Sequence, residues 1–226
     1  FQKHSLRSQR TLRLPNGVLF QAYPDCVVSS SLIYADWPEY YELKFIREEL
    51  RNGDAVIDVG ANVGHISLLL ADVVDPSNIF AFEPTPVSFQ RLVRNWELNG
   101  WPTTGLFQVA IGAKPGSVFV RDIDRPVTTN NVANSPYRER CVEVPLKRLD
   151  DLRHLWQKQE IGFVKIDVEG YEDEVFRGCR NILETSRPHL VMFESLSNTV
   201  DPRIASLLTE FQYILFQLDS QGRPDT

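Results

Sequence analysis

The chain has 226 residues, of which 42% are hydrophobic, and its formal net charge at pH 7 is -6. This length can bury one substantial core, so we expect a single domain overall. The acidic balance lacks the basic surface that nucleic-acid-binding proteins need, and no apolar run is as long as a membrane span, so we expect neither a nucleic-acid partner nor membrane insertion.

Three cysteines, Cys26, Cys141 and Cys179, are scattered along the chain. Their spacing is not that of a metal site, and an odd number argues against a disulfide framework. We therefore expect the three cysteines to be reduced, which is typical of proteins inside the cell. We therefore expect a cytoplasmic protein.

The N-terminal part, residues 1–36, begins with a polar tail. Residues 12–23 contain Pro15-Asn16-Gly17, a turn signal between two short extended runs, which predicts a β-hairpin. We expect this hairpin to pack on a domain that spans residues 37–226.

Strand and helix patterns alternate through that domain. A first helix is predicted after Pro38, with its end near Asn52-Gly53. Strands are predicted at residues 56–59, 78–82, 106–111, 116–121, 142–146, 162–167, 189–193 and 213–218. Further helices are predicted at residues 65–74, 86–98, 149–159, 171–184 and 203–211. This alternation predicts an α/β fold with a doubly wound, mostly parallel sheet and helices on both faces.

One long polar segment interrupts the alternation at residues 121–140. Long segments without regular structure in compact domains are often functional. We therefore predict that it forms a lid over the acceptor of whatever reaction the domain carries out.

The glycine turn, residues 58–64, follows the buried strand at residues 56–59 and opens the next helix. Gly60 and Gly64 allow a ligand to approach the backbone closely, and the start of a helix presents N–H groups without helical partners. Strand, glycine turn and helix in this order are typical of nucleotide-binding folds.

An acid in this turn indicates which nucleotide binds. Asp58 precedes a D-x-G-x-x-x-G pattern, whereas dinucleotide folds use G-x-G-x-x-G. A carboxylate repels a pyrophosphate and favours S-adenosylmethionine, which carries an ammonium and a sulfonium. Two alternatives remain open: a turn without a ligand, and an unusual dinucleotide turn in a nicotinamide-linked oxidoreductase.

Acids also follow the other predicted strands, at Glu83, Asp167 and Glu194. Open α/β sheets bind ligands beyond the carboxyl ends of their strands. Glu83 lies one helix and one strand after the glycine turn, where a carboxylate accepts hydrogen bonds from ribose hydroxyls. We therefore expect the acids to surround one ligand.

Four motifs occur in this order: Val56-Ile57-Asp58-Val59-Gly60-Ala61-Asn62-Val63-Gly64, Phe82-Glu83-Pro84, Ala110-Ile111-Gly112 and Lys165-Ile166-Asp167-Val168-Glu169-Gly170-Tyr171-Glu172. Together they resemble the FkbM family of S-adenosylmethionine-dependent methyltransferases, over about residues 37–194. The resemblance implies a class I methyltransferase (Rossmann-like) fold. It also implies O-methylation, because family members methylate hydroxyls of macrolides, saccharides and related metabolites.

The resemblance implies a role for each motif. The glycine turn would surround the methionine part of the cofactor, Glu83 would contact the ribose, and Ala110 and Ile111 would lie near the adenine. The candidate cofactor-binding residues are Asp58, Gly60, Ala61, Asn62, Gly64, His65, Glu83, Pro84, Ala110, Ile111 and Glu39, the last from a Trp-x-Glu-x-x-Glu spacing.

Methyl transfer to an alcohol needs an aligned oxygen and a group that accepts its proton. Asp167 and Glu169 are the candidate catalytic residues, and Asp167 is the first choice because the charge of Glu169 also suits the start of a helix. Alternatively, both acids and Glu194 could hold Mg²⁺. We predict no metal, because sequence spacing does not show that three carboxylates converge.

These observations predict an S-adenosylmethionine-dependent O-methyltransferase that acts on a small hydroxylated metabolite or saccharide. The alternative is a methyltransferase-like domain that binds the cofactor as a scaffold or sensor, without catalysis. The sequence does not indicate an oligomeric state.

Overall fold

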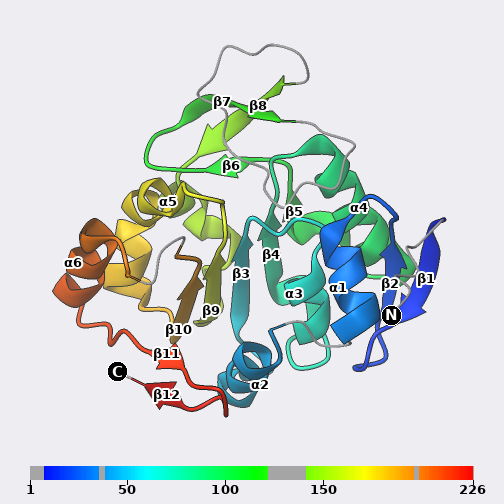
Figure 1. The fold of residues 1–226 in the computed structure, drawn as a ribbon. Helices are drawn as coiled ribbons and strands as arrows, with labels where there is room; N and C mark the ends of the chain where they lie inside the picture. The colour runs from blue at the N-terminus through cyan, green and yellow to red at the C-terminus, as the bar shows by residue number, and fades with distance from the viewer. Residues whose placement is uncertain (1–7, 36–38, 122–140, 196–198, 226) are drawn as a thin grey trace.

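The computed structural model describes residues 8–35, 39–121, 141–195 and 199–225. Its centre is a fully parallel sheet of five strands in the order β10-β9-β3-β4-β5 (Figure 1). The strands are β3 (Ala55–Val59), β4 (Ile79–Phe82), β5 (Leu106–Phe107), β9 (Ile161–Ile166) and β10 (Leu190–Phe193). The chain runs outward from β3 to β5 on one side and from β9 to β10 on the other. This confirms the predicted doubly wound α/β fold and places its switch point between β3 and β9.

Helices cover both faces of this sheet. One face carries α2 (Tyr40–Glu49), α3 (His65–Leu70) and α4 (Pro86–Leu98); the other carries α5 (Glu172–Gly178), α6 (Pro202–Glu210), the 3-10 helix η3 (Leu149–Leu155) and the π-helical turn η4 (Ile182–Ser186). Successive side chains of a strand point to opposite faces. Val56 accordingly packs in the first core and Ile57 in the second. Both faces of β3 are therefore buried, which explains its nearly continuous apolar sequence.

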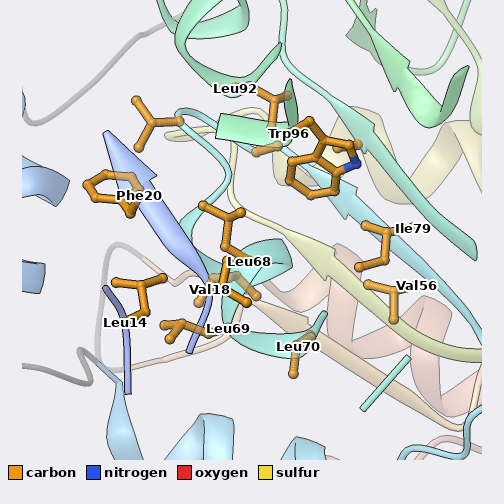
Figure 2. Packing of buried hydrophobic residues seen from close by; sticks show 14 of the residues in the cluster. Leu14, Val18, Phe20, Val56, Leu68, Leu69, Leu70, Ile79, Leu92 and Trp96 are labelled. Atoms are coloured by element: carbon orange, nitrogen blue, oxygen red, sulfur yellow. The ribbon is translucent and has the colours of Figure 1, made fainter. Parts of the chain in front are cut away.

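The predicted N-terminal hairpin is present. β1 (Arg10–Arg13) pairs antiparallel with β2 (Leu19–Ala22). Figure 2 shows residues of this hairpin, including Val18 and Phe20, in the same apolar cluster as Leu68 of α3 and Trp96 of α4. The helix α1 (Val27–Ala35) follows and was not predicted. The proposed division at residues 36/37 falls outside the described residues and stays a prediction.

Asn95 of α4 joins the hairpin to the glycine turn. Its Oδ1 accepts a hydrogen bond from the N–H of Gln21 at 2.8 Å, and its Nδ2 donates to the carbonyl oxygen of Val63 at 2.9 Å. The side chain is fully buried. We expect Asn95→Ala to lower the free energy of unfolding by about 2–4 kcal/mol, because it leaves two backbone groups unpaired.

Urea unfolding measures this loss, and Asn181→Ala is the matched control. Asn181 is exposed, so its replacement should change the free energy of unfolding by less than about 0.5 kcal/mol. Equal stability of the two variants would contradict the role assigned to Asn95.

The prediction of a single strand at residues 106–111 was wrong, because this segment forms two short strands that belong to two different sheets. The N–H of Val109 donates to the carbonyl oxygen of Phe107 at 3.1 Å, which turns the chain after β5. β6 (Ala110–Ile111) then pairs with β8 (Cys141–Lys147), which also pairs with β7 (Gly116–Arg121). Figure 1 shows this small sheet above the central one. The predicted lid falls almost entirely at residues 122–140, outside the described residues, and stays a prediction.

Other predicted elements are shorter in the structure. The strand predicted at residues 213–218 does not join the central sheet: β11 (Gln217–Leu218) pairs with β12 (Pro224–Asp225) in a separate ribbon. The helix predicted at residues 171–184 is divided after Gly178, which packs so closely on the carbonyl oxygen of Gly112 that a Cβ would lie 2.1 Å from it. Two further short 3-10 helices are η1 (Pro76–Asn78) and η2 (Thr103–Gly105). In the described ranges, no helix combines the length and apolarity needed to cross a bilayer.

Candidate active site

A cavity of about 210 Å³ lies where β3, β4 and β9 end, at the switch point of the sheet. Many of the predicted site residues line it: Glu39, Gly60, Asn62, His65, Glu83, Pro84, Ala110, Ile111, Asp167 and Glu169. Asp58, Ala61 and Gly64 are buried in the adjoining strand and turn and do not reach its surface. We name this space the switch-point cavity.

Sequence reasoning missed one wall of the switch-point cavity. Val27, Val28 and Ser31 of α1 line it, together with Tyr171. The stretch that forms α1 carries no motif, so only its tertiary packing places it at the site. The helix contributes apolar and hydroxyl groups to the lining.

A second groove is larger, about 660 Å³, and lies along β10 and the segment 214–218. Its lining is dominated by apolar side chains such as Phe45, Met192 and Ile214. The switch-point cavity instead gathers acids with perturbed pKa values, which is the usual property of a reactive site. We therefore take the smaller space as the candidate active site.

Backbone strain is also concentrated at the switch-point cavity. Glu39, Asn62 and Glu169 have φ angles of 55°, 52° and 55°, a left-handed conformation that is costly for residues with a Cβ, and all three line it. Strained residues persist where the surrounding structure holds them, and they cluster at functional sites. The positive φ angles therefore indicate the same site as the sequence motifs, and they do so independently of them.

The N–H groups of the glycine turn are already used inside the protein. Those of Gly60 and Ala61 donate to the carbonyl oxygen of Phe82 at 2.9 and 3.1 Å. That of Asn62 donates to Oε2 of Glu83 at 2.8 Å. A pyrophosphate would therefore find none of these three N–H groups available, and the expectation of free N–H groups at the start of the next helix stays a prediction.

Asp58 is engaged inside the fold. Its Oδ2 accepts a hydrogen bond from Oγ of Ser67 at 2.6 Å, and its Oδ1 lies 3.4 Å from Nζ of Lys165. Lys165 also contacts Oδ2 of Asp167 at 3.1 Å and the carbonyl oxygen of Gly60 at 3.1 Å. Burial disfavours the ammonium of Lys165, but the carboxylates of Asp58 and Asp167 outweigh this effect and raise its pKa. The lysine is therefore a buried cation between two acids.

Glu83 and His65 are two buried polar side chains that line the switch-point cavity. Glu83 accepts hydrogen bonds from the N–H groups of Asn62 and Thr85, each at 2.8 Å; burial raises its pKa, and these two bonds oppose the rise. Burial, reinforced by the Lys165 cation, lowers the pKa of His65 to about 4. His65 is therefore neutral at physiological pH, and its Nδ1 has no hydrogen-bond partner among the described residues.

Three acids converge beyond the ends of β9 and β10, and two of them, Asp167 and Glu169, line the switch-point cavity. Carboxylate oxygens of Asp167, Glu169 and Glu194 all lie within 4.8 Å of one another. Burial, followed by the charges of Glu194 and Asp167, raises the pKa of Glu169 to about 7. Sequence spacing did not decide whether these carboxylates meet, and the structure shows that they do.

Glu172 holds the backbone around Glu169. Its Oε1 accepts hydrogen bonds from the N–H groups of Val168 and Gly170, at 3.2 and 3.1 Å. The side chain of Glu172 is buried at the start of α5. This explains how Glu169 is kept in its left-handed conformation, with neighbours bound on both sides.

The sequence of this chain is similar to those of known methyltransferases. The family model "Methyltransferase FkbM domain" matches residues 58–216. Hexuronic acid methyltransferase AglP of Haloferax volcanii is 28% identical over 169 residues, which cover 74% of this chain and 66% of AglP. The 31-O-demethyl-FK506 methyltransferase FkbM of Streptomyces tacrolimicus is 28% identical over 76% of each chain. Methyltransferase sdnD of Sordaria araneosa is 27% identical, over 86% of this chain and 93% of its own.

A solved structure shares the fold. The crystal structure of a methyltransferase FkbM from Methylobacillus flagellatus matches with a TM-score of 0.50 and 17% identity, over 80% of this chain and 46% of that one. The chain thus spans just under two thirds of AglP and less than half of the solved protein. Because the family model covers most of the chain, including the glycine turn and all three converging acids, this protein belongs to the FkbM methyltransferase family.

Proposed function

We propose that this protein is an S-adenosylmethionine-dependent O-methyltransferase that acts on a hydroxyl of a small metabolite or saccharide. The observation that carries the proposal is the charge of the switch-point cavity. Glu39, Glu83, Asp167 and Glu169 line it, and its described lining contains no Lys or Arg. Such a site favours a ligand with positive groups, whereas a dinucleotide brings a pyrophosphate that the acids repel.

The residues present suit the cofactor in three respects. Glu83 keeps acceptor capacity for ribose hydroxyls, since each of its oxygens accepts one hydrogen bond in the fold. Val109, Ala110 and Ile111 offer an apolar wall for the adenine. His65 adds a neutral imidazole to the lining, which does not repel the positive groups of the cofactor. S-adenosylmethionine supplies a methyl group that its sulfonium has already activated.

We assign the proton-accepting role to Glu169. A general base works best when its pKa is close to the working pH, and the pKa of Glu169 is about 7. Asp167 is instead paired with Lys165. Its proposed role is to hold the acceptor hydroxyl in line, while Glu169 takes the proton. The proposed reaction uses no metal.

The acceptor class is supported by the relatives' names. One relative is a hexuronic acid methyltransferase and another is a methyltransferase of 31-O-demethyl-FK506. We propose a small hydroxylated molecule as the acceptor here and a cytoplasmic location for the protein. Incubation with labelled S-adenosylmethionine and fractionated metabolites, followed by mass spectrometry, identifies the molecule that gains a methyl group.

A thermal-shift comparison tests the cofactor. S-adenosylmethionine at about 100 times its Kd stabilises the folded state by about 2.7 kcal/mol, which should raise Tm by about 5–10 °C. NAD should leave Tm unchanged, because the acids of the switch-point cavity oppose its pyrophosphate. A shift with NAD alone would favour the oxidoreductase alternative. A shift with S-adenosylmethionine, but no methylated product from any acceptor pool, would favour the scaffold or sensor alternative.

A further inference from the structure

We propose that Lys165 is a positioning residue that holds the glycine turn and the loop of Asp167 and Glu169 in one fixed arrangement, so that cofactor and base are placed together. The inference rests on the function proposed above. Lys165 does not line the switch-point cavity and is 2% exposed. It therefore acts through the residues it binds.

Three protein oxygens surround the ammonium of Lys165. They are the Gly60 carbonyl oxygen at 3.1 Å, Oδ2 of Asp167 at 3.1 Å and Oδ1 of Asp58 at 3.4 Å. The ammonium donates a hydrogen bond to the Gly60 carbonyl oxygen and forms ion pairs with the two carboxylates. Asp58 and Lys165 are direct partners in the pairing of β3 with β9. One side chain thus links the ends of the two strands that form the switch point.

The contact with Gly60 matters because the backbone of a glycine can rotate between positive and negative φ angles. Gly60 has a φ of 79°, and glycine adopts either sign of φ at little cost. The bond from Lys165 to its carbonyl oxygen fixes the peptide that also carries the N–H of Ala61. The next N–H, that of Asn62, holds Glu83. Without the lysine, the peptide after Gly60 loses one of its two bonds and is held through the Ala61 N–H to the Phe82 carbonyl oxygen.

The contact with Asp167 acts on the other half of the site. Asp167 stands two residues before Glu169, and one of its oxygens belongs to the converging group of acids. The ammonium draws one oxygen of Asp167 toward the glycine turn. A purely structural lysine would need only to neutralise Asp58. The bonds to Gly60 and Asp167 are the additional observations that indicate positioning.

The test compares Lys165→Met with Arg47→Met. Arg47 binds both oxygens of Asp72, at 2.6 and 2.7 Å, and does not line the switch-point cavity. Both variants remove a cation from an ion pair. Hydrogen exchange read by mass spectrometry is expected to speed up at least tenfold in peptides covering residues 59–63 and 166–171 of Lys165→Met, and in neither segment of Arg47→Met.

Kinetics give the second readout, at a temperature where each variant is folded. In Lys165→Met we expect kcat to fall about 100-fold, as for a misplacement of roughly 1 Å, together with weaker binding of S-adenosylmethionine. Lys165→Arg keeps the charge and donors and should retain more of kcat. It also serves as the second variant if Lys165→Met does not fold.

Two results would overturn the proposal. One is a lower Tm for Lys165→Met with unchanged exchange in both segments. The other is a kcat that stays within about twofold of the wild type. If the wild-type protein binds no S-adenosylmethionine, the proposed function fails, while the exchange experiment still decides whether Lys165 holds the two segments.

Discussion

Glu169→Gln is expected to lower kcat by about 10²–10⁴-fold while leaving the affinity for S-adenosylmethionine unchanged. Glutamine has nearly the same shape as glutamate but does not accept a proton from an alcohol. Glu169 lines the switch-point cavity, and Glu172 binds the N–H groups on both sides of it, so the substitution should not displace the loop. Steady-state kinetics and calorimetric titration of the cofactor measure the two effects.

The pH dependence of kcat also tests whether Glu169 is the general base. A general base works only when deprotonated, so the wild-type kcat should rise with pH through about 7, the pKa of Glu169, and level off above it. Glu194→Gln is the matched control. It removes a like charge that raises this pKa, so the rising limb should move to lower pH while the plateau is kept. A flat profile between about pH 6 and 8 would exclude Glu169 as the base.

Treatment with a chelator distinguishes a mechanism with Glu169 as a free base from a mechanism that uses a bound metal ion. Carboxylates of Asp167, Glu169 and Glu194 lie close enough to share a cation. If Glu169 acts as a free base, exhaustive treatment with EDTA should leave kcat unchanged. Loss of activity that Mg²⁺ restores would replace the proposed base with a metal-assisted mechanism.

Gly60→Ala is expected to lower the free energy of unfolding by more than about 4 kcal/mol, or to prevent folding. Two costs add. Alanine at a φ of 79° is strained by about 1–2 kcal/mol. In addition, its Cβ would lie 1.8 Å from the carbonyl oxygen of Asp167, a backbone atom at the end of a central strand that has no room to move.

Gly17→Ala isolates the first of these costs. Gly17 has a φ of 85°, and no atom lies within 4 Å of the place where the alanine methyl group would stand, so only the strain of about 1–2 kcal/mol should be observed. Urea unfolding compares the two variants. Similar losses for both would show that the β3 turn and the end of β9 are not in close contact in solution.

The sequence predicts the central strands well because their signals are local. Val56 and Ile57 lie in a short apolar run that is typical of a strand buried on both faces, and Gly60 marks its end. The acids at strand ends could also be assigned, since the carboxyl ends of parallel strands meet at one edge. The elements predicted poorly depend on distant contacts: β6 leaves the central sheet because β8 is there to pair with it.

The sequence by itself therefore determined the doubly wound fold, the family and most of the residues that line the switch-point cavity, because strand periodicity, turn glycines and motif spacing are properties of short stretches. Only the tertiary structure decided that Asp58 pairs with Lys165 inside the fold, that the N–H groups of Gly60 and Ala61 are already bound, and that Glu169 meets Glu194. Each of these depends on distances between segments far apart in the chain. Such distances set burial and charge, and through them the chemistry of the site.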